Sequence, residues 1–202
     1  QVLILGVGFE TRIARLPIDH TAVSVYEVDL TDMIAAREAL LADLPNFPVL
    51  RRETAGINLE LENLAERIVA STSFSPKHPC IVIMEGVSFY LDEATNGRIL
   101  ASLHCLMQHP HSRLALDVVA EEVVTGNTHF TDIHNFVEGM RELGEPFLFG
   151  ISDTTEYFSQ HGYRIEAKIP SNCYRRETPD ELYAVYNFVV VSPLAQCDEV
   201  LL

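Results

Sequence analysis

The sequence has 202 residues, of which 48% are apolar, with ten glycines and ten prolines. This length and composition predict one compact domain and argue against disorder or a collagen-like structure. The sequence has 14 Lys and Arg residues and 29 Asp and Glu residues, so its formal net charge is −15. Because a negative charge repels nucleic acids and anionic membrane surfaces, we expect neither as a partner.

Short apolar runs alternate with longer segments of helical period, a pattern typical of βαβ units and a mostly parallel sheet. Strands are expected at Val2–Leu5, Val23–Val28, Val49–Arg52, Cys80–Met84, Arg113–Val118, Arg164–Lys168 and Tyr183–Val191. Helices are expected at Thr31–Leu44, Leu61–Ser71, Asp92–Gln108, Phe136–Leu143 and Asp153–His161. The last two strands are too close along the chain for a helical crossover, so we expect an antiparallel pair. The predicted fold class is α/β, with a seven-stranded, mostly parallel sheet that ends in an antiparallel hairpin.

The first strand runs into a turn that contains Gly6 and Gly8 and is followed by a short helix. Glycine permits backbone conformations and a close ligand approach that a Cβ atom would prevent, and a helix N-terminus offers free N–H groups. Thr11 replaces the third glycine of a Gly-x-Gly-x-x-Gly fingerprint, so a purely structural turn is the alternative.

Acidic residues end two of the predicted strands. Glu27 and Asp29 close the second strand, and a carboxylate at that edge can accept hydrogen bonds from both hydroxyls of a ribose. Strand alternation puts both side chains on the same face, so the sequence does not choose between them. Glu85 follows the fourth strand. Because parallel strands end at one edge of a sheet, we expect these acids to converge on the glycine turn, with solvated or turn-capping roles as the alternative.

Other features favour an intracellular protein without disulfides, metal sites or membrane-spanning helices. The four cysteines form no Cys-x-x-Cys pair, which predicts neither disulfides nor a zinc site and favours the cytoplasm. No window reaches the roughly eighteen apolar residues of a membrane-spanning helix. The spacings of His109 with His111 and of His129 with His134 match no zinc motif, so we expect no metal. The chain starts at Gln1 rather than Met, which suggests that something upstream was cleaved or left out.

Three blocks resemble the leucine carboxyl methyltransferase family: QVLILGVGFETR from Gln1, YEVDL from Tyr26 and EGVSFYL from Glu85. The family contains protein phosphatase methyltransferases and bacterial polyketide-type O-methyltransferases. The resemblance extends to about Val118 and implies a Rossmann-like class I methyltransferase fold that uses S-adenosylmethionine, with residues 1–202 forming a single methyltransferase domain.

The resemblance also implies individual roles. The residues expected to bind the cofactor are Gly6 and Gly8 for the methionine part, Asp29 for the ribose with Glu27 as its neighbour, Asn58 and Leu59 for the adenine end, and Glu85 for the methionine ammonium. The family has an acid where Asn58 stands; the amide oxygen can still accept a hydrogen bond, but the charge is lost. Family members carry helices before the first strand that supply basic residues and part of a lid. Without them we expect a complete fold around an incomplete or unusually open site.

The implied reaction is an in-line displacement, in which the protein mainly aligns the acceptor with the methyl group. We expect an O-methyltransferase acting on a carboxylate or hydroxyl of a small molecule or peptide. A carboxylate needs no general base, whereas a hydroxyl does, with His129, His134 and Tyr90 as candidates, so the catalytic residues stay unassigned. Segment 121–161 is expected to cover the acceptor, with apolar contacts from Phe130, Phe136, Met140, Phe147 and Phe149, although ordinary core positions explain these equally well.

Two other functions remain open. An NAD(P)-linked oxidoreductase could use the same glycine turn, but Thr11, the antiparallel ending and the lack of a Tyr-x-x-x-Lys pair oppose it. A cofactor-binding domain without activity is the second alternative. The loop arginines Arg175 and Arg176 could meet an anionic acceptor or simply be solvated surface residues.

Overall fold

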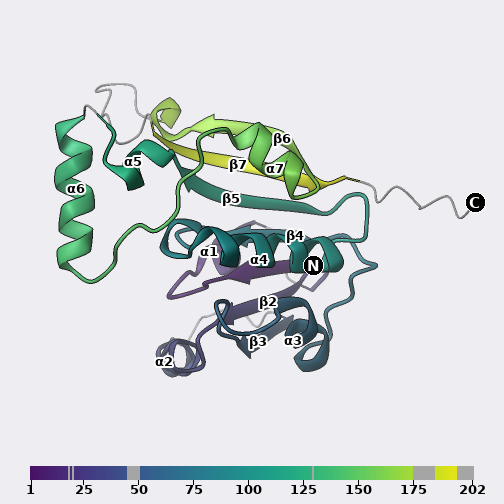
Figure 1. Ribbon diagram of the computed structural model, residues 1–202. Coiled ribbons are helices and arrows are strands. Elements are labelled where there is room, and N and C mark those ends of the chain that lie inside the picture. The colour runs from purple at the N-terminus through teal and green to yellow at the C-terminus, as the bar shows by residue number, and fades with distance from the viewer. Residues whose placement is uncertain (18, 20, 45–50, 129, 175–184, 195–202) are drawn as a thin grey trace, which may run out of the picture.

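The centre of the molecule is a seven-stranded sheet with strand order β3-β2-β1-β4-β5-β7-β6 (Figure 1). The structure is a computed structural model that describes residues 1–17, 19, 21–44, 51–128, 130–174 and 185–194. Its strands are β1 (Val2–Leu5), β2 (Ser24–Asp29), β3 (Arg51–Gly56), β4 (Ile81–Met84), β5 (Arg113–Val119), β6 (Tyr163–Pro170) and β7 (Tyr186–Pro193). Strands β1 to β5 are parallel, and β7 lies antiparallel between β5 and β6. The predicted α/β fold with a mostly parallel sheet and a C-terminal antiparallel pair is confirmed.

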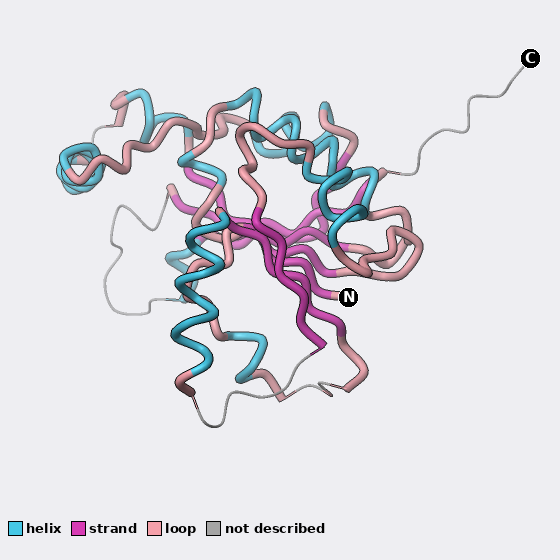
Figure 2. The backbone as a smooth tube through the Cα atoms, turned by 90° about the horizontal axis from the view of Figure 1, so that it is seen from below, coloured by secondary structure: helices cyan, strands magenta, loops and turns pink. Residues whose placement is uncertain are grey.

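Helices lie on either side of the twisted sheet (Figure 2). They are α1 (Arg12–Arg15), α2 (Thr31–Ala42), α3 (Leu64–Ser71), α4 (Glu93–Leu106), α5 (Glu121–Thr125), α6 (Thr131–Glu142) and α7 (Thr154–Gln160), with short 3-10 turns η1 (Ser88–Tyr90) and η2 (Ser171–Tyr174). Among the described residues, no helix is both long enough and apolar enough to cross a membrane. Nor do those residues contain a group of three or more His, Cys, Asp or Glu side chains that could hold a metal ion.

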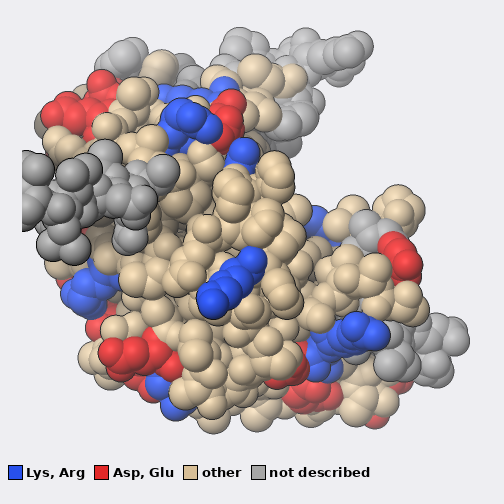
Figure 3. All heavy atoms as spheres, turned by 90° about the vertical axis from the view of Figure 1, so that its right-hand side faces the viewer, with Lys and Arg blue, Asp and Glu red and all other residues tan. Residues whose placement is uncertain are grey.

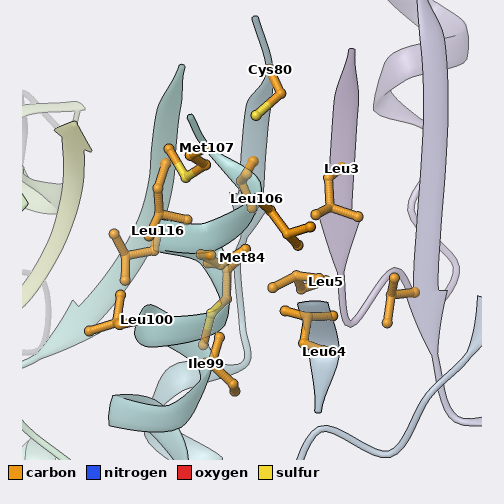
Figure 4. Packing of buried hydrophobic residues seen from close by; sticks show 14 of the residues in the cluster. Leu3, Leu5, Leu64, Cys80, Met84, Ile99, Leu100, Leu106, Met107 and Leu116 are labelled. Atoms are coloured by element: carbon orange, nitrogen blue, oxygen red, sulfur yellow. The ribbon is translucent and has the colours of Figure 1, made fainter. Parts of the chain in front are cut away.

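The main core lies between the sheet and helices α3, α4 and α7. Figure 4 shows the part of it that is formed by side chains of β1, β4, β5, α3 and α4. Leu3 and Leu5 point into it from β1, whereas Val2 and Ile4 point to the opposite face, and all four are buried. This two-sided burial explains why β1 is apolar throughout rather than alternating. Because each fully buried aliphatic side chain contributes about 1.5–3 kcal/mol, these packed layers hold the carboxyl ends of the strands in fixed positions.

The opposite face of the sheet is covered unevenly. Ile13 of α1 and Ile34 of α2 pack on β1 and β2. Beside them, residues of β4, β5 and β7 line an apolar depression of about 490 Å³, bordered by Arg12 and Glu85. Ile81 of β4 is exposed there.

Most predicted elements are shifted by a few residues at one or both ends, and two of them, β3 and α6, differ most from their predicted bounds. Strand β3 covers Arg51–Gly56 instead of Val49–Arg52, and residues 49 and 50 lie outside the described residues. An edge strand pairs on one side only, here with β2, and so tolerates a polar sequence that an apolar-run rule misses. Helix α6 begins at Thr131, five residues before the predicted start at Phe136. Ile133, Val137 and Met140 give it one apolar stripe.

Candidate functional site

The glycine turn after β1 has positive φ angles at both glycines, +65° at Gly6 and +47° at Gly8. Gly6 N and Val7 N both donate to the carbonyl of Val28, at 2.9 and 3.1 Å, which folds the turn back over β2. A Cβ atom at Gly6 would lie 2.4 Å from Val87 Cγ2, whereas one at Gly8 would meet no atom within 4 Å. Gly6 is therefore required by packing, and Gly8 leaves open space above the turn.

This difference predicts unequal costs for two alanine substitutions. Gly6→Ala should lower the free energy of unfolding by about 2–4 kcal/mol, since backbone strain of about 1–2 kcal/mol adds to the contact with Val87. Gly8→Ala should cost about 1–2 kcal/mol, from the strain alone. Urea denaturation of both variants measures the difference, and equal losses would show that the Val87 contact is unimportant.

Asp29, at the end of β2, holds the glycine turn in place. Its Oδ2 accepts a hydrogen bond from Gly8 N at 2.8 Å, and its Oδ1 accepts one from Leu30 N at 2.8 Å. Each carboxylate oxygen can accept a second hydrogen bond. The half-buried Asp29 therefore combines a structural role with free capacity to bind hydroxyl groups.

Glu27 lies two residues earlier and is almost fully buried in an arginine network. Arg37 of α2 donates to both of its oxygens, with Nη2 at 2.8 Å and Nε at 3.2 Å, and Arg52 Nη1 contacts Oε2 at 2.9 Å. Arg37 Nη1 also donates to the carbonyl of Gly8 at 3.4 Å. The Glu27 side chain is only 3% exposed, and both of its oxygens are bound by arginines. Its role is therefore structural, since it holds Arg37, which in turn binds the Gly8 carbonyl. Of the two acids that the sequence could not separate, Asp29 is the accessible one.

Glu85, which follows β4, forms an ion pair with Arg12 of α1. Arg12 Nη1 lies 2.7 Å from Glu85 Oε2, and Nη2 donates to Glu10 Oε2 at 2.9 Å. The hydrogen bond with Glu85 is the main cause of a raised Arg12 pKa, and burial partly opposes it. Both side chains of the Arg12–Glu85 pair are 41% exposed, so the pair lies at the rim of the site.

A pocket of about 310 Å³ opens between the carboxyl ends of β1, β4 and β5. Its polar lining comes from Gly6, Glu10, Glu85, Gly86, Asp117 and Tyr186. Asp117 is fully buried. It accepts hydrogen bonds from Gly86 N at 2.9 and 3.0 Å and from the Tyr186 hydroxyl. Burial raises the pKa of Asp117, and the Tyr186 hydrogen bond partly opposes this. Burial is also the main cause of a raised Tyr186 pKa.

The raised pKa of Asp117 predicts a pH dependence of stability. Between the ordinary aspartate pKa and the raised value, the folded protein binds more protons than the unfolded chain, so this group's contribution falls as pH rises. Asp117→Asn removes that contribution. The variant should therefore gain stability relative to wild type as pH increases from about 4 to about 7, measured by urea denaturation. A difference that stays constant with pH would contradict the raised pKa.

Asn58 and Leu59 follow β3, at the far end of the same edge. The Asn58 Oδ1 atom accepts a hydrogen bond from Glu60 N at 2.9 Å, and Leu59 packs against the main core. Ile57 N donates to the carbonyl of Asp29 at 2.8 Å, which ties this loop to the end of β2. Strand order thus places the loop, Asp29, the glycine turn and Glu85 in sequence along one edge.

Of the three candidate general bases, Tyr90 and His134 lie in the described part of the chain, and their surroundings differ. Tyr90 is half-buried, and its pKa is raised by burial first, then by Glu145 and Asp117. The Nε2 atom of His134, on α6, is hydrogen-bonded to the carbonyl of Thr128 before that helix, at 2.9 Å. His129, Arg175 and Arg176 lie outside the described residues.

Sequence reasoning missed four polar groups of this edge: Arg12, Arg37, Asp117 and Tyr186. Asp117 carried a usable signal, an acid inside the apolar run LALDVV, similar to the signal that pointed to Glu85. Arg12 follows the glycine turn directly but has no distinguishing pattern.

The opposite end of the molecule, which faces the viewer in Figure 3, shows mainly uncharged residues between separate charged clusters.

Comparison with known proteins places the chain in a family. Residues 1–104, just over half of the chain, match the family described as leucine carboxyl methyltransferase. The chain belongs to this family. Proteins of Mycolicibacterium vanbaalenii and Mycobacterium avium, each named "Putative S-adenosyl-L-methionine-dependent methyltransferase", are 29% and 30% identical over 88% and 83% of this chain. The matches cover 58% and 56% of those relatives, so the chain spans little more than half their length.

Solved structures agree on the fold. The mitomycin 7-O-methyltransferase MmcR superposes with a TM-score of 0.63 at 14% identity, covering 95% of this chain and 48% of that one. The glycopeptide N-methyltransferase MtfA, solved with sinefungin, gives a TM-score of 0.58 at 14% identity, covering 95% and 79%. At these identities the likeness concerns the fold alone. It confirms the predicted Rossmann-like fold of class I methyltransferases.

Proposed function

We propose that this chain binds S-adenosyl-L-methionine at the carboxyl edge of its sheet and transfers the methyl group to an oxygen atom of an acceptor. The observation that carries the proposal is the order of groups along that edge: Asn58 after β3, Asp29 on β2, the glycine turn after β1 and Glu85 after β4. A nucleoside joined to an amino acid presents a base, two ribose hydroxyls and an ammonium group in the same order. The names of the family and of the relatives support the same ligand.

The chemistry of these groups fits that cofactor. Asp29 keeps acceptor capacity for the ribose hydroxyls, and Glu85 is an accessible carboxylate for the ammonium. The second lone pair of Asn58 Oδ1 can accept from the adenine amino group, beside Leu59. At Gly8 and Gly86 a Cβ atom would meet nothing within 4 Å, which leaves the space that a ligand over the turn requires.

When bound, the cofactor supplies an electrophilic methyl group on a sulfonium. The residues of the chain then have to orient the acceptor oxygen, since an in-line displacement needs no protein atom bonded to the methyl group. A carboxylate acceptor is already ionised and needs no base. For a hydroxyl acceptor, the Tyr186 oxygen can take the acceptor's proton while the Tyr186 hydroxyl passes its own proton to the Asp117 carboxylate, with which it is hydrogen-bonded, so that the proton ends on Asp117.

We place the acceptor, a small molecule or peptide, next to segment 121–161. Phe89 of η1 packs against Phe147 and Tyr186, with ring centroids 4.5 and 6.0 Å apart, and this aromatic cluster continues under α5 and α6. Tyr186 belongs both to this cluster and to the wall of the pocket. That position supports an acceptor site between the glycine turn and segment 121–161, within one methyltransferase domain of residues 1–202.

Calorimetric titration with S-adenosyl-L-methionine, S-adenosylhomocysteine and NAD tests the proposal. We expect the first two to bind and NAD to bind weakly or not at all, because β7 runs antiparallel where a dinucleotide-binding sheet stays parallel. Binding of NAD without S-adenosylhomocysteine would overturn the proposal in favour of an oxidoreductase. Cofactor binding without methyl transfer to any acceptor oxygen would favour a binding domain without activity.

A further inference from the structure

The residues that the proposed function assigns to the cofactor leave the carboxylate of its amino-acid end without a partner. The described residues that line the pocket beside the glycine turn include the acids Glu10, Glu85 and Asp117 but no Lys or Arg. An amino-acid ligand carries a carboxylate as well as an ammonium, so this lining would repel half of it. A cation is needed next to Glu85.

Arg12 is at that position. Its guanidinium borders the neighbouring apolar depression together with Glu85, and its Nη1 lies 2.7 Å from the Glu85 carboxylate. The side chain is 41% exposed, so it can shift at little cost in burial. Glu10 holds Nη2 at 2.9 Å, which keeps the guanidinium near the turn when Glu85 is released.

The Arg12–Glu85 pair has the charges that complement an amino-acid zwitterion. A guanidinium presents several N–H donors in a planar fork that matches a carboxylate, and a carboxylate matches an ammonium. Inserting a zwitterion between the two side chains replaces one ion pair by two. In the free protein Arg12 and Glu85 thus neutralise each other's charge, and each carries the charge that one end of a zwitterion requires.

We propose that Arg12 binds the α-carboxylate of the cofactor, and that ligand binding exchanges the Arg12–Glu85 ion pair for Arg12–carboxylate and Glu85–ammonium pairs. The proposal rests on the proposed function. It assigns the carboxylate to a residue of α1 within this chain.

Two ligands that differ only in the carboxylate test the assignment: S-adenosyl-L-methionine and decarboxylated S-adenosylmethionine. Calorimetry on the wild-type chain should show about 10-fold tighter binding of the first, the effect of one added charge-assisted contact. In Arg12→Gln this preference should vanish. The decarboxylated ligand should bind the variant as well as or better than wild type, because Glu85 is no longer occupied by Arg12.

Arg15→Gln is the matched control. Arg15 lies on the same short helix, is 70% exposed and reaches Glu10 only at 3.8 Å, so this variant should keep the wild-type preference. A preference that persists in Arg12→Gln, or is already absent in wild type while both ligands bind, overturns the role of Arg12 and leaves the proposed cofactor standing. Failure of both ligands to bind wild type overturns both proposals.

Discussion

Replacing Glu27 by Gln is expected to lower the free energy of unfolding by about 3 kcal/mol or more, because the Arg37 guanidinium then stays buried without its counter-charge. Arg37 is 2% exposed and contacts Glu27 with two of its nitrogens. The effect should reach the glycine turn, since Arg37 also donates to the Gly8 carbonyl. Urea denaturation followed by circular dichroism measures the loss.

Glu38→Gln provides the control for this prediction. Glu38 pairs with Arg52 in the same network, but its side chain is 41% exposed. An exposed ion pair contributes at most about 1 kcal/mol, so the variant should remain close to wild type. If both substitutions destabilise the protein equally, burial is not what makes the Glu27–Arg37 pair important.

Asp29→Ala is expected to weaken binding of S-adenosylhomocysteine by about 100-fold, since two hydrogen bonds between ribose hydroxyls and a carboxylate would be lost. The substitution also removes the acceptor of Gly8 N, which loosens the turn on which the ligand would lie. The stability cost should be small, because the half-buried Gly8 N–H can bind water instead. Calorimetric titration of the variant and of wild type gives the two affinities.

Asp32→Ala is the control for Asp29→Ala. Asp32 lies three residues further along, in the first turn of α2, and its side chain accepts from Met33 N. It is exposed and outside the pocket lining, so the affinity should not change. Unchanged affinity in Asp29→Ala, with S-adenosylhomocysteine still bound, would place the ribose elsewhere.

The sequence predicted those parts of the fold that local patterns determine. Strand β1 matched its expected bounds because both of its faces are buried and its residues are uniformly apolar. Strand β3 was misplaced, since an edge strand with the sequence RRETAG lacks that signal. The antiparallel ending was predicted from the short connection alone, whereas the insertion of β7 between β5 and β6 depends on pairing that no local pattern contains.

The candidate site divides in the same way. Asp29 and Glu85 could be picked out because an acid at the end of an apolar strand is a local signal. The burial of Glu27 could not, because it depends on Arg37 ten residues away on the following helix. The contact between Asp117 and Tyr186 joins residues 69 positions apart and exists only in the assembled sheet.

The position of β7 has a consequence for how the chain folds during synthesis. Leu114 of β5 pairs with Val191, so the inner partner of β5 emerges from the ribosome near the end of this sequence. Until then, β5 lacks the strand that covers this edge in the folded sheet, and an uncovered apolar strand edge promotes association between nascent chains. Such long-range pairing also slows folding. Tyr186 of β7 forms its hydrogen bond with Asp117 only when β7 pairs with β5, so the wall of the pocket is completed by that same pairing.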